Sequence, residues 1–145
     1  MSTIITLTTD YGTRDSFVAS MKGIILRTNP QVQILDITHE IAPQDIWEAA
    51  FTLKSVYDQF PKGTVHLAVV DPGVGSGRRP IIVVTEGYFF VGPDNGLFSM
   101  IYRDAERLRV HHITSGHYFV ANPGPTFHGK DIFAPVAAWL TRGIP

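Results

Sequence analysis

The chain has 145 residues, 44% of them hydrophobic, and a formal net charge of −1 at pH 7. This length and composition predict one domain with a buried core and exclude a disordered chain, and the near-neutral charge argues against a nucleic-acid surface built on phosphate contacts. The absence of cysteine excludes disulfides and thiolate metal sites and favours a cytoplasmic protein, and no apolar run reaches membrane-spanning length.

The first half of the chain alternates strand and helix patterns. Residues 3–9 are a β-branched run, which predicts a strand and leaves no room for a signal-peptide pattern. Apolar residues at helical spacing predict a helix over 17–28, closed by Pro30. Residues 32–37 predict the second strand, and an apolar stripe over 46–60 predicts the second helix.

The second half continues the alternation with shorter elements. Glycine and proline in residues 92–96 predict a turn. The last helix should begin near Gly129 or Lys130 and end before Gly143, with Pro135 early in it or kinking it. The other expected elements are strands at 64–70, 81–85, 88–91 and 108–113, and a short helix at 97–102.

This alternation predicts an α/β fold with a mostly parallel sheet and helices on both faces, a three-layer, Rossmann-like arrangement. Polar residues follow the predicted strands, and loops at the carboxyl ends of such a sheet converge on one crevice. The sequence therefore predicts a polar pocket. Its expected members are Asp10 after the first strand, Thr38-His39-Glu40 after the second, Asp71 after the third, Asp94-Asn95 after the fifth, and residues 126–131 before the last helix.

The glycine-rich stretch from Asp71 to Pro80 lies between two predicted strands and carries Arg78 and Arg79. Its glycines allow sharp bends or close approach to a ligand. It has no final glycine of GxGxxG and no GK[ST], and it runs into a strand instead of a helix. We therefore expect a ligand other than a pyrophosphate at this loop.

Each polar residue also has a purely structural explanation. Asp15 or Ser16 could cap the helix that begins at Phe17, and residues 94–96 could form only a turn. Histidines such as His39 could lie at the surface or be satisfied by neighbours. Only the joint placement of these residues at strand ends favours a functional site.

Four motifs occur in order along the chain: Thr9-Asp10-Tyr11-Gly12 with Asp15, Asp71-Pro72-Gly73-Val74-Gly75 with Arg78, Pro93-Asp94-Asn95-Gly96, and residues 127–135 beginning Phe127-His128-Gly129. Together they resemble the S-adenosyl-L-methionine (SAM) hydroxide adenosyltransferases, or SAM hydrolases, which are homologues of bacterial fluorinase and chlorinase. The resemblance covers essentially the whole chain. It implies hydrolysis of SAM to adenosine and L-methionine, with no cofactor and no metal.

The resemblance also implies roles for individual residues. In the halogenating relatives the positions matching Asp71 and His128 are tyrosines and the position matching Gly129 is a serine, so this chain favours water over halide. Which member of the water-activating trio accepts the proton stays open. The implied catalytic residues are Asp71, Arg78 and His128, and the implied substrate-binding residues are Asp10 for the ribose hydroxyls, Asp15 for the methionine ammonium, and Asn95 and Phe127 for the pocket walls.

Members of this family normally carry a second, smaller β-rich domain, and their site lies between subunits of a trimer. Residues 1–145 resemble the N-terminal catalytic domain alone, so the resemblance implies a homotrimer when the C-terminal domain is present. Two alternatives remain at this point. One is a metal-dependent phosphohydrolase with cation ligands at Asp10, Asp71, Asn95 and His128, and the other is a non-catalytic module that binds a nucleoside.

Overall fold

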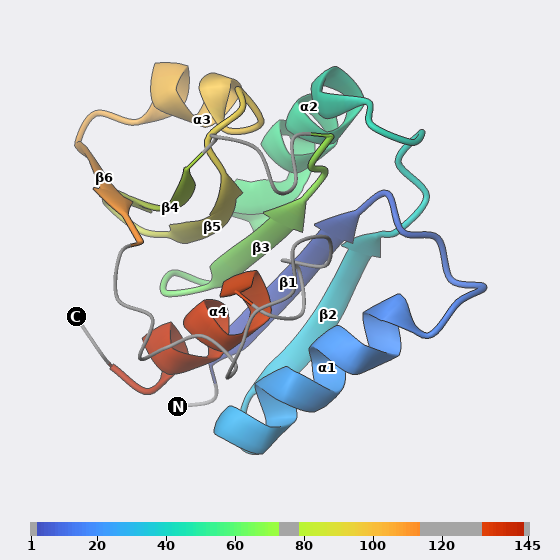
Figure 1. Cartoon of the computed structure of the whole chain (residues 1–145). Helices are drawn as coiled ribbons and strands as arrows, with labels where there is room; N and C mark the ends of the chain where they lie inside the picture. Colours follow the sequence, from blue (N-terminus) through green and yellow to red (C-terminus); the bar gives the residue numbers. More distant parts are fainter. Residues whose placement is uncertain (1–2, 73–78, 114–131, 144–145) are drawn as a thin grey trace.

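The computed structural model describes residues 3–72, 79–113 and 132–143, which form a six-stranded sheet flanked by helices (Figure 1). None of the helices in these residues is long and apolar enough to cross a membrane. The strands are β1 (Ile4–Thr9), β2 (Gln33–Thr38), β3 (Val65–Val69), β4 (Pro80–Thr85), β5 (Phe89–Pro93) and β6 (Leu108–His112). The helices are α1 (Phe17–Thr28), α2 (Ile46–Val56), a 3₁₀ turn η1 (Tyr57–Gln59), α3 (Ser99–Asp104) and α4 (Ala134–Thr141).

The strand order is β2-β1-β3-β5-β4-β6, and the sheet is mostly parallel, as the sequence predicts. The strands β2, β1, β3 and β5 pair in parallel, whereas β4 pairs antiparallel with both β5 and β6. Because β4 alone is reversed, five strands point their carboxyl ends toward the same edge. We call this edge the carboxyl edge.

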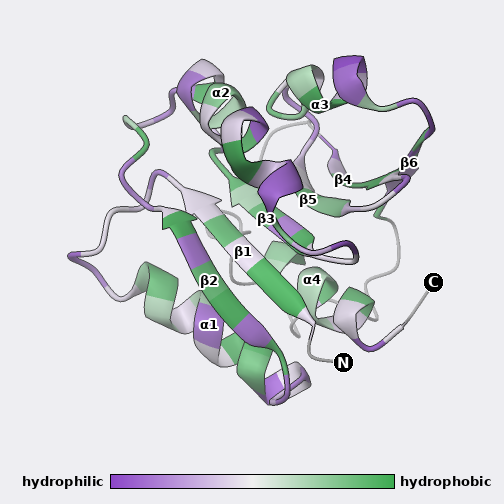
Figure 2. Ribbon diagram, turned by 180° about the vertical axis from the view of Figure 1, so that it is seen from behind, coloured by the Kyte–Doolittle hydropathy of each residue, from purple (hydrophilic) through white to green (hydrophobic). Residues whose placement is uncertain are grey.

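Two apolar clusters lie on opposite faces of the sheet. Side chains alternate along a strand, so Leu67 of β3 joins the cluster under α1 and α4, whereas Ala68 joins the cluster under α2 and α3. Figure 2 shows the apolar strands between these helices, seen from the α2 side. Helices therefore cover both faces, and they bury β1 and β3 in the centre.

The helices follow the sequence pattern with small differences. Helix α1 buries Val18, Met21 and Ile25, which recur at helical spacing. Helix α2 begins after Asp45, whose side chain accepts a hydrogen bond from the backbone N–H of Glu48 and caps the helix. The predicted second helix extended to residue 60, but the α-helix ends at Val56 and continues as the 3₁₀ turn η1.

The predicted turn over 92–96 is partly wrong, because β5 extends through Gly92 and Pro93. Helix α3 begins at Ser99, two residues later than predicted. Helix α4 ends before Gly143 and holds Pro135 in its first turn, where the missing N–H costs no helical hydrogen bond. The start predicted for this helix near Gly129 or Lys130 lies outside the described residues.

Candidate functional site

Asp10 and Asp71 follow two neighbouring strands at the carboxyl edge. Asp10 directly follows β1, and Asp71 stands two residues after β3, while Thr9 and Val69 at the ends of these strands are register partners. The chain leaves β1 for β2 on one side and returns to β3 on the other. A point where strand order reverses in this way is where open α/β sheets bind ligands. The two carboxylates therefore border the binding crevice expected of this topology.

Other parts of the chain reach the same edge. Because β4 is reversed, its first residue, Pro80, pairs with Pro93 at the end of β5, and the backbone N–H of Asp94 donates to the carbonyl oxygen of Arg79 at 2.8 Å. The N–H of Ile113, after β6, donates to the carbonyl oxygen of Pro80 at 2.8 Å. The start of β4, the end of β5 and the residue after β6 therefore all lie at the carboxyl edge.

The carboxylate of Asp10 holds the loop after β2. Its Oδ2 atom accepts a hydrogen bond of 2.7 Å from the backbone N–H of Gln44. Gln44 has a φ of 64°, which is the left-handed region that residues other than glycine seldom adopt. Since an ionised carboxylate can accept about four hydrogen bonds, this contact leaves acceptor capacity for ligand hydroxyls.

Asn95 reaches back from the end of β5 to the end of β3. Its Nδ2 atom donates to the carbonyl oxygen of Val70 at 2.9 Å, and its Oδ1 atom accepts from the N–H of Leu97 at 3.2 Å. Because Val70 immediately precedes Asp71, Asn95 fixes the backbone that carries this carboxylate. The sequence pointed to Asn95 as a wall of the pocket, and both of these hydrogen bonds are to the protein backbone.

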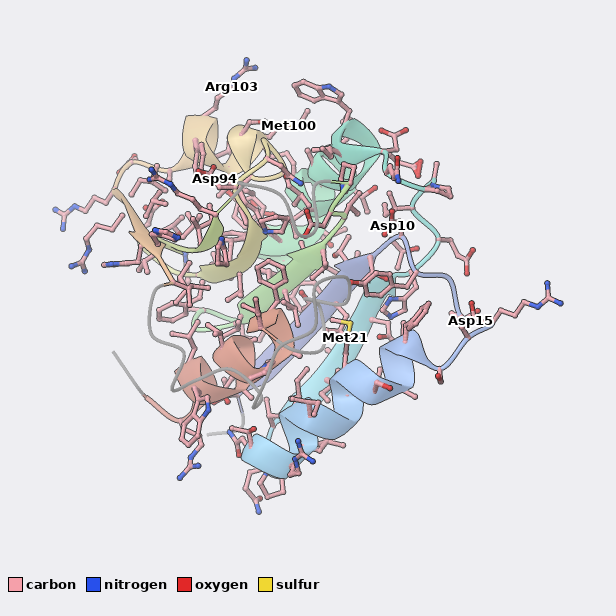
Figure 3. The ribbon with its side chains drawn as sticks, viewed as in Figure 1. Asp10, Asp15, Met21, Asp94, Met100 and Arg103 are labelled. Atoms are coloured by element: carbon pink, nitrogen blue, oxygen red, sulfur yellow. The ribbon has the colours of Figure 1, made fainter. Side chains whose placement is uncertain are left out.

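Asp15 lies farther from the sheet than Asp10 does, on the exposed loop that leads into α1 (Figure 3). Ser16 occupies the N-cap position of α1, and its side chain makes no capping hydrogen bond. Arg78, Phe127 and His128 lie outside the described residues, so their predicted roles stay predictions.

His39, which the sequence placed among the expected pocket residues and also among the histidines that could be satisfied by neighbours, is buried at this edge. Its Nδ1 atom lies 2.7 Å from Thr9 Oγ1, and its Nε2 atom lies 2.7 Å from Asp36 Oδ1. The signal for it was present, because His39 belongs to the polar stretch Thr38-His39-Glu40 that follows the second predicted strand. The signal for Gln44 was absent, because glutamine carries no preference for a positive φ.

Asp36, which contacts His39, also forms an ion pair with Lys22. Burial disfavours the ionised form of Asp36, but hydrogen bonds from Lys22 and His39 outweigh burial and hold the pKa of Asp36 below its ordinary value. Asp36 therefore remains an anion next to the buried imidazole. Among residues 3–72, 79–113 and 132–143, no cluster of three histidine or carboxylate side chains is arranged to hold a metal ion.

Comparisons with known proteins agree with the family resemblance that the four motifs indicate. Residues 5–145 match the model of the SAM hydroxide adenosyltransferase N-terminal domain. The chain is 45% identical over 140 residues to the (R)-S-adenosyl-L-methionine hydrolase of Methanocaldococcus jannaschii, covering 93% of this chain and 52% of that protein. A fluorinase from an Actinoplanes species is more distant, with 27% identity over 165 residues, 98% of this chain and 55% of its own.

A solved structure has the same fold as this chain. An uncharacterised conserved protein from Thermotoga maritima superimposes with a TM-score of 0.93 and 41% identity, over 98% of this chain and 55% of its own. The chain thus spans about half the length of the curated relatives and of the solved structure that it matches. The family resemblance drawn from the four motifs is confirmed.

Proposed function

The chain belongs to the SAM hydroxide adenosyltransferase family, and from that membership we propose that the protein hydrolyses SAM to adenosine and L-methionine. The observation that carries the proposal is that Asp10 and Asp71 follow two neighbouring parallel strands at the carboxyl edge, where the strand order reverses. One carboxylate is then available to bind the ribose, and the other to act on the nucleophile.

The reaction requires a positioned water molecule more than it requires a strong base. The water oxygen attacks the ribose 5′ carbon, the carbon–sulfur bond breaks, and its electron pair returns to sulfur to give the neutral thioether of methionine. The proton of the water passes to Asp71 or to His128. Arg78 stabilises the hydroxide character of the attacking oxygen, because its guanidinium stays charged.

The acidic character of the carboxyl edge supports a cationic substrate. Asp10, Asp71 and Asp94 follow three neighbouring strands, and the sulfonium of SAM carries a positive charge. Carboxylates near that position attract the substrate and repel a halide ion, which favours water as the nucleophile. Asp10 is assigned to the ribose hydroxyls and Asp15 to the methionine ammonium, with Asn95 and Phe127 at the pocket walls.

The proposal also covers the architecture, the domain organisation, the oligomeric state and the location of the protein. We infer a three-layer, Rossmann-like architecture, since helices lie over both faces of the sheet. Family membership supports a second, β-rich domain and a homotrimer that completes the pocket, with SAM as the substrate and neither cofactor nor metal. The cysteine-free composition supports a cytoplasmic location.

The deciding experiment incubates the full-length protein and the 145-residue chain with SAM and separates the products by chromatography. We expect equal amounts of adenosine and L-methionine from the full-length protein, in the presence of chelator and of excess chloride or fluoride. A 5′-halogenated nucleoside in the mass spectrum would move the protein to the halogenating branch. Activity lost with chelator would favour the metal-dependent alternative, and adenosine binding without turnover would favour the nucleoside-binding module.

A further inference from the structure

The turn after β1 and the loop after β2 are joined by hydrogen bonds on both sides of Asp10. His39 makes two of them, one through its side chain and one through its backbone. The bonds are Thr9 Oγ1 to His39 Nδ1 at 2.7 Å, Gly12 N–H to the His39 carbonyl oxygen at 2.7 Å, Ile41 N–H to the Thr9 carbonyl oxygen at 3.4 Å, and Gln44 N–H to Asp10 Oδ2 at 2.7 Å.

The second ring nitrogen of His39, Nε2, is also held by a contact, with Asp36. The His39 side chain is 3% exposed, and Nε2 lies 2.7 Å from Asp36 Oδ1. A carboxylate can only accept, so Nε2 carries a proton, and in the neutral ring Nδ1 accepts from the hydroxyl of Thr9. Lys22 Nζ lies 2.9 Å from the second carboxylate oxygen of Asp36 and completes the chain of contacts to α1.

Carboxylate, imidazole and hydroxyl in this order are also the parts of a nucleophilic triad. Two observations exclude that role for this set. Thr9 is 0% exposed, so its hydroxyl reaches no substrate. The Oγ1 atom also accepts a hydrogen bond of 3.2 Å from the backbone N–H of Tyr11, which fixes the residue after Asp10. The set therefore holds the two residues that flank Asp10.

We propose that His39 is a positioning residue for Asp10: through Thr9 and through its own carbonyl oxygen it sets the direction in which the Asp10 carboxylate faces the ligand. The nature of that ligand, a nucleoside ribose, rests on the proposed function. A group that acts this way changes the binding of substrate and of adenosine alike and leaves the chemical step unchanged.

Two variants separate the two ring contacts. In His39→Asn the side-chain oxygen replaces Nδ1 and still accepts from Thr9, while the contact with Asp36 is lost. In His39→Gln the amide nitrogen replaces Nε2 and still donates to Asp36, while the contact with Thr9 is lost. If His39 acts through Thr9, the first variant retains ligand binding and the second does not.

His66 supplies a matched control. It is also fully buried, and its Nδ1 atom also lies 2.7 Å from a threonine of β1, Thr6 Oγ1. It differs in position, because Thr6 lies in the middle of β1 and its register partner is His66 itself. His66→Asn should therefore lower stability without changing the binding of ligand at the carboxyl edge.

The experiment uses the full-length protein and measures KM and kcat for SAM, the Kd of adenosine, and hydrogen exchange at the Gly12 and Gln44 amides. We expect His39→Gln to raise KM and Kd about tenfold with kcat within about twofold, and to speed exchange at both amides. His39→Asn should lie within about threefold of the unmodified protein in both constants.

Unchanged exchange at Gly12 and Gln44 in folded His39→Gln would overturn the proposal, whatever the activity. Equal losses in the Asn and Gln variants, or an equal rise of Kd in His66→Asn, would reduce His39 to a stabilising residue and overturn it too. If the unmodified protein turns over no SAM, the proposed function fails, and the exchange data still decide the role of His39.

Discussion

The side-chain amide of Asn95 donates a hydrogen bond of 2.9 Å to the carbonyl oxygen of Val70, the residue immediately before Asp71. The loop after β5 thus controls the backbone that carries the proposed catalytic carboxylate. This contact makes the position of Asp71 depend on a residue that is distant in sequence.

We expect Asn95→Ala to lower kcat for SAM about tenfold, because a small displacement of a catalytic group is costly. Asn95→Asp is the informative partner, since its carboxylate can still accept from the N–H of Leu97 but cannot donate to Val70. Single-turnover rates for both variants test this. A normal rate in Asn95→Asp would show that the Leu97 contact alone suffices.

Substitution of Asp71 should affect the chemical step. We expect Asp71→Asn to cut kcat about a hundredfold or more, typical of losing a positioned acid–base or electrostatic group. Asp94→Asn is the control, because Asp94 is exposed at the same edge after β5 and is assigned only to the negative charge of that edge, with no part in activating the water. A similar loss in both variants would point to the net charge of the edge and away from Asp71 itself.

Substitution of Asp10 should weaken binding more than it slows the bound reaction. Asp10→Ala is expected to cost about 1.5–3 kcal/mol of adenosine binding, the scale for hydrogen bonds to a charged group. Asp10→Asn keeps an acceptor for the Gln44 N–H and should therefore preserve the loop after β2. Isothermal titration with adenosine distinguishes the two. Unchanged affinity in the alanine variant would leave Asp10 with a structural role only.

His66 makes the stability of the fold depend on pH. Burial lowers its pKa to about 4, partly opposed by the hydrogen bond to the carbonyl oxygen of Tyr57, while the unfolded value is near 6.5. The unfolded chain therefore binds a proton that the folded chain rejects, and stability falls as the pH drops from about 6.5 to about 4. The difference amounts to about 3 kcal/mol.

Urea unfolding of the unmodified chain and of His66→Asn at pH 7, 5.5 and 4.5 measures this dependence. The asparagine variant should lose less stability on acidification, because asparagine does not titrate. Carboxylates titrate in both proteins, so the difference between the two curves isolates the histidine. Parallel curves would contradict the assignment.

Gly92 is expected to resist substitution. A Cβ atom there would collide with the carbonyl oxygen of Ala68 on β3 and approach the Phe98 ring to 2.9 Å. Gly92→Ala should therefore lower the free energy of unfolding by about 1–3 kcal/mol, the range for overpacking. Gly23→Ala, in α1 with nothing within 4 Å of the added atom, should raise it by about 0.5–1 kcal/mol. Thermal unfolding of both variants compares them directly.

The spacing of apolar residues predicted the elements that bury a single apolar face. Helix α1 has the predicted bounds, because its apolar residues repeat at helical spacing and Pro30 follows. The placement of Asp10 and Asp71 at one edge followed from neighbouring parallel strands whose carboxyl ends share that edge. The reversal of β4 was not predicted, although the short connection between β4 and β5 favours an antiparallel hairpin.

The remaining differences depend on tertiary contacts that no local pattern encodes. Gly92 and Pro93 have turn chemistry, yet they continue β5, because the close approach of β3 needs a residue without a side chain. The positive φ of Gln44 accompanies a hydrogen bond to Asp10, which forms only in the folded chain. The sequence placed His39 among the expected pocket residues, but its contact with Thr9 likewise forms only in the folded chain.

The reversed direction of β4 has a consequence for how such proteins diverge. A connection between parallel strands must cross from one edge of the sheet to the other, but the connection from β3 to β4 leaves and re-enters at the same edge, between Asp71 and Pro80. Its length and composition can therefore drift without shifting the register of any strand. Sequence changes in this connection can accumulate in a lineage while the pairing of the strands is inherited unaltered.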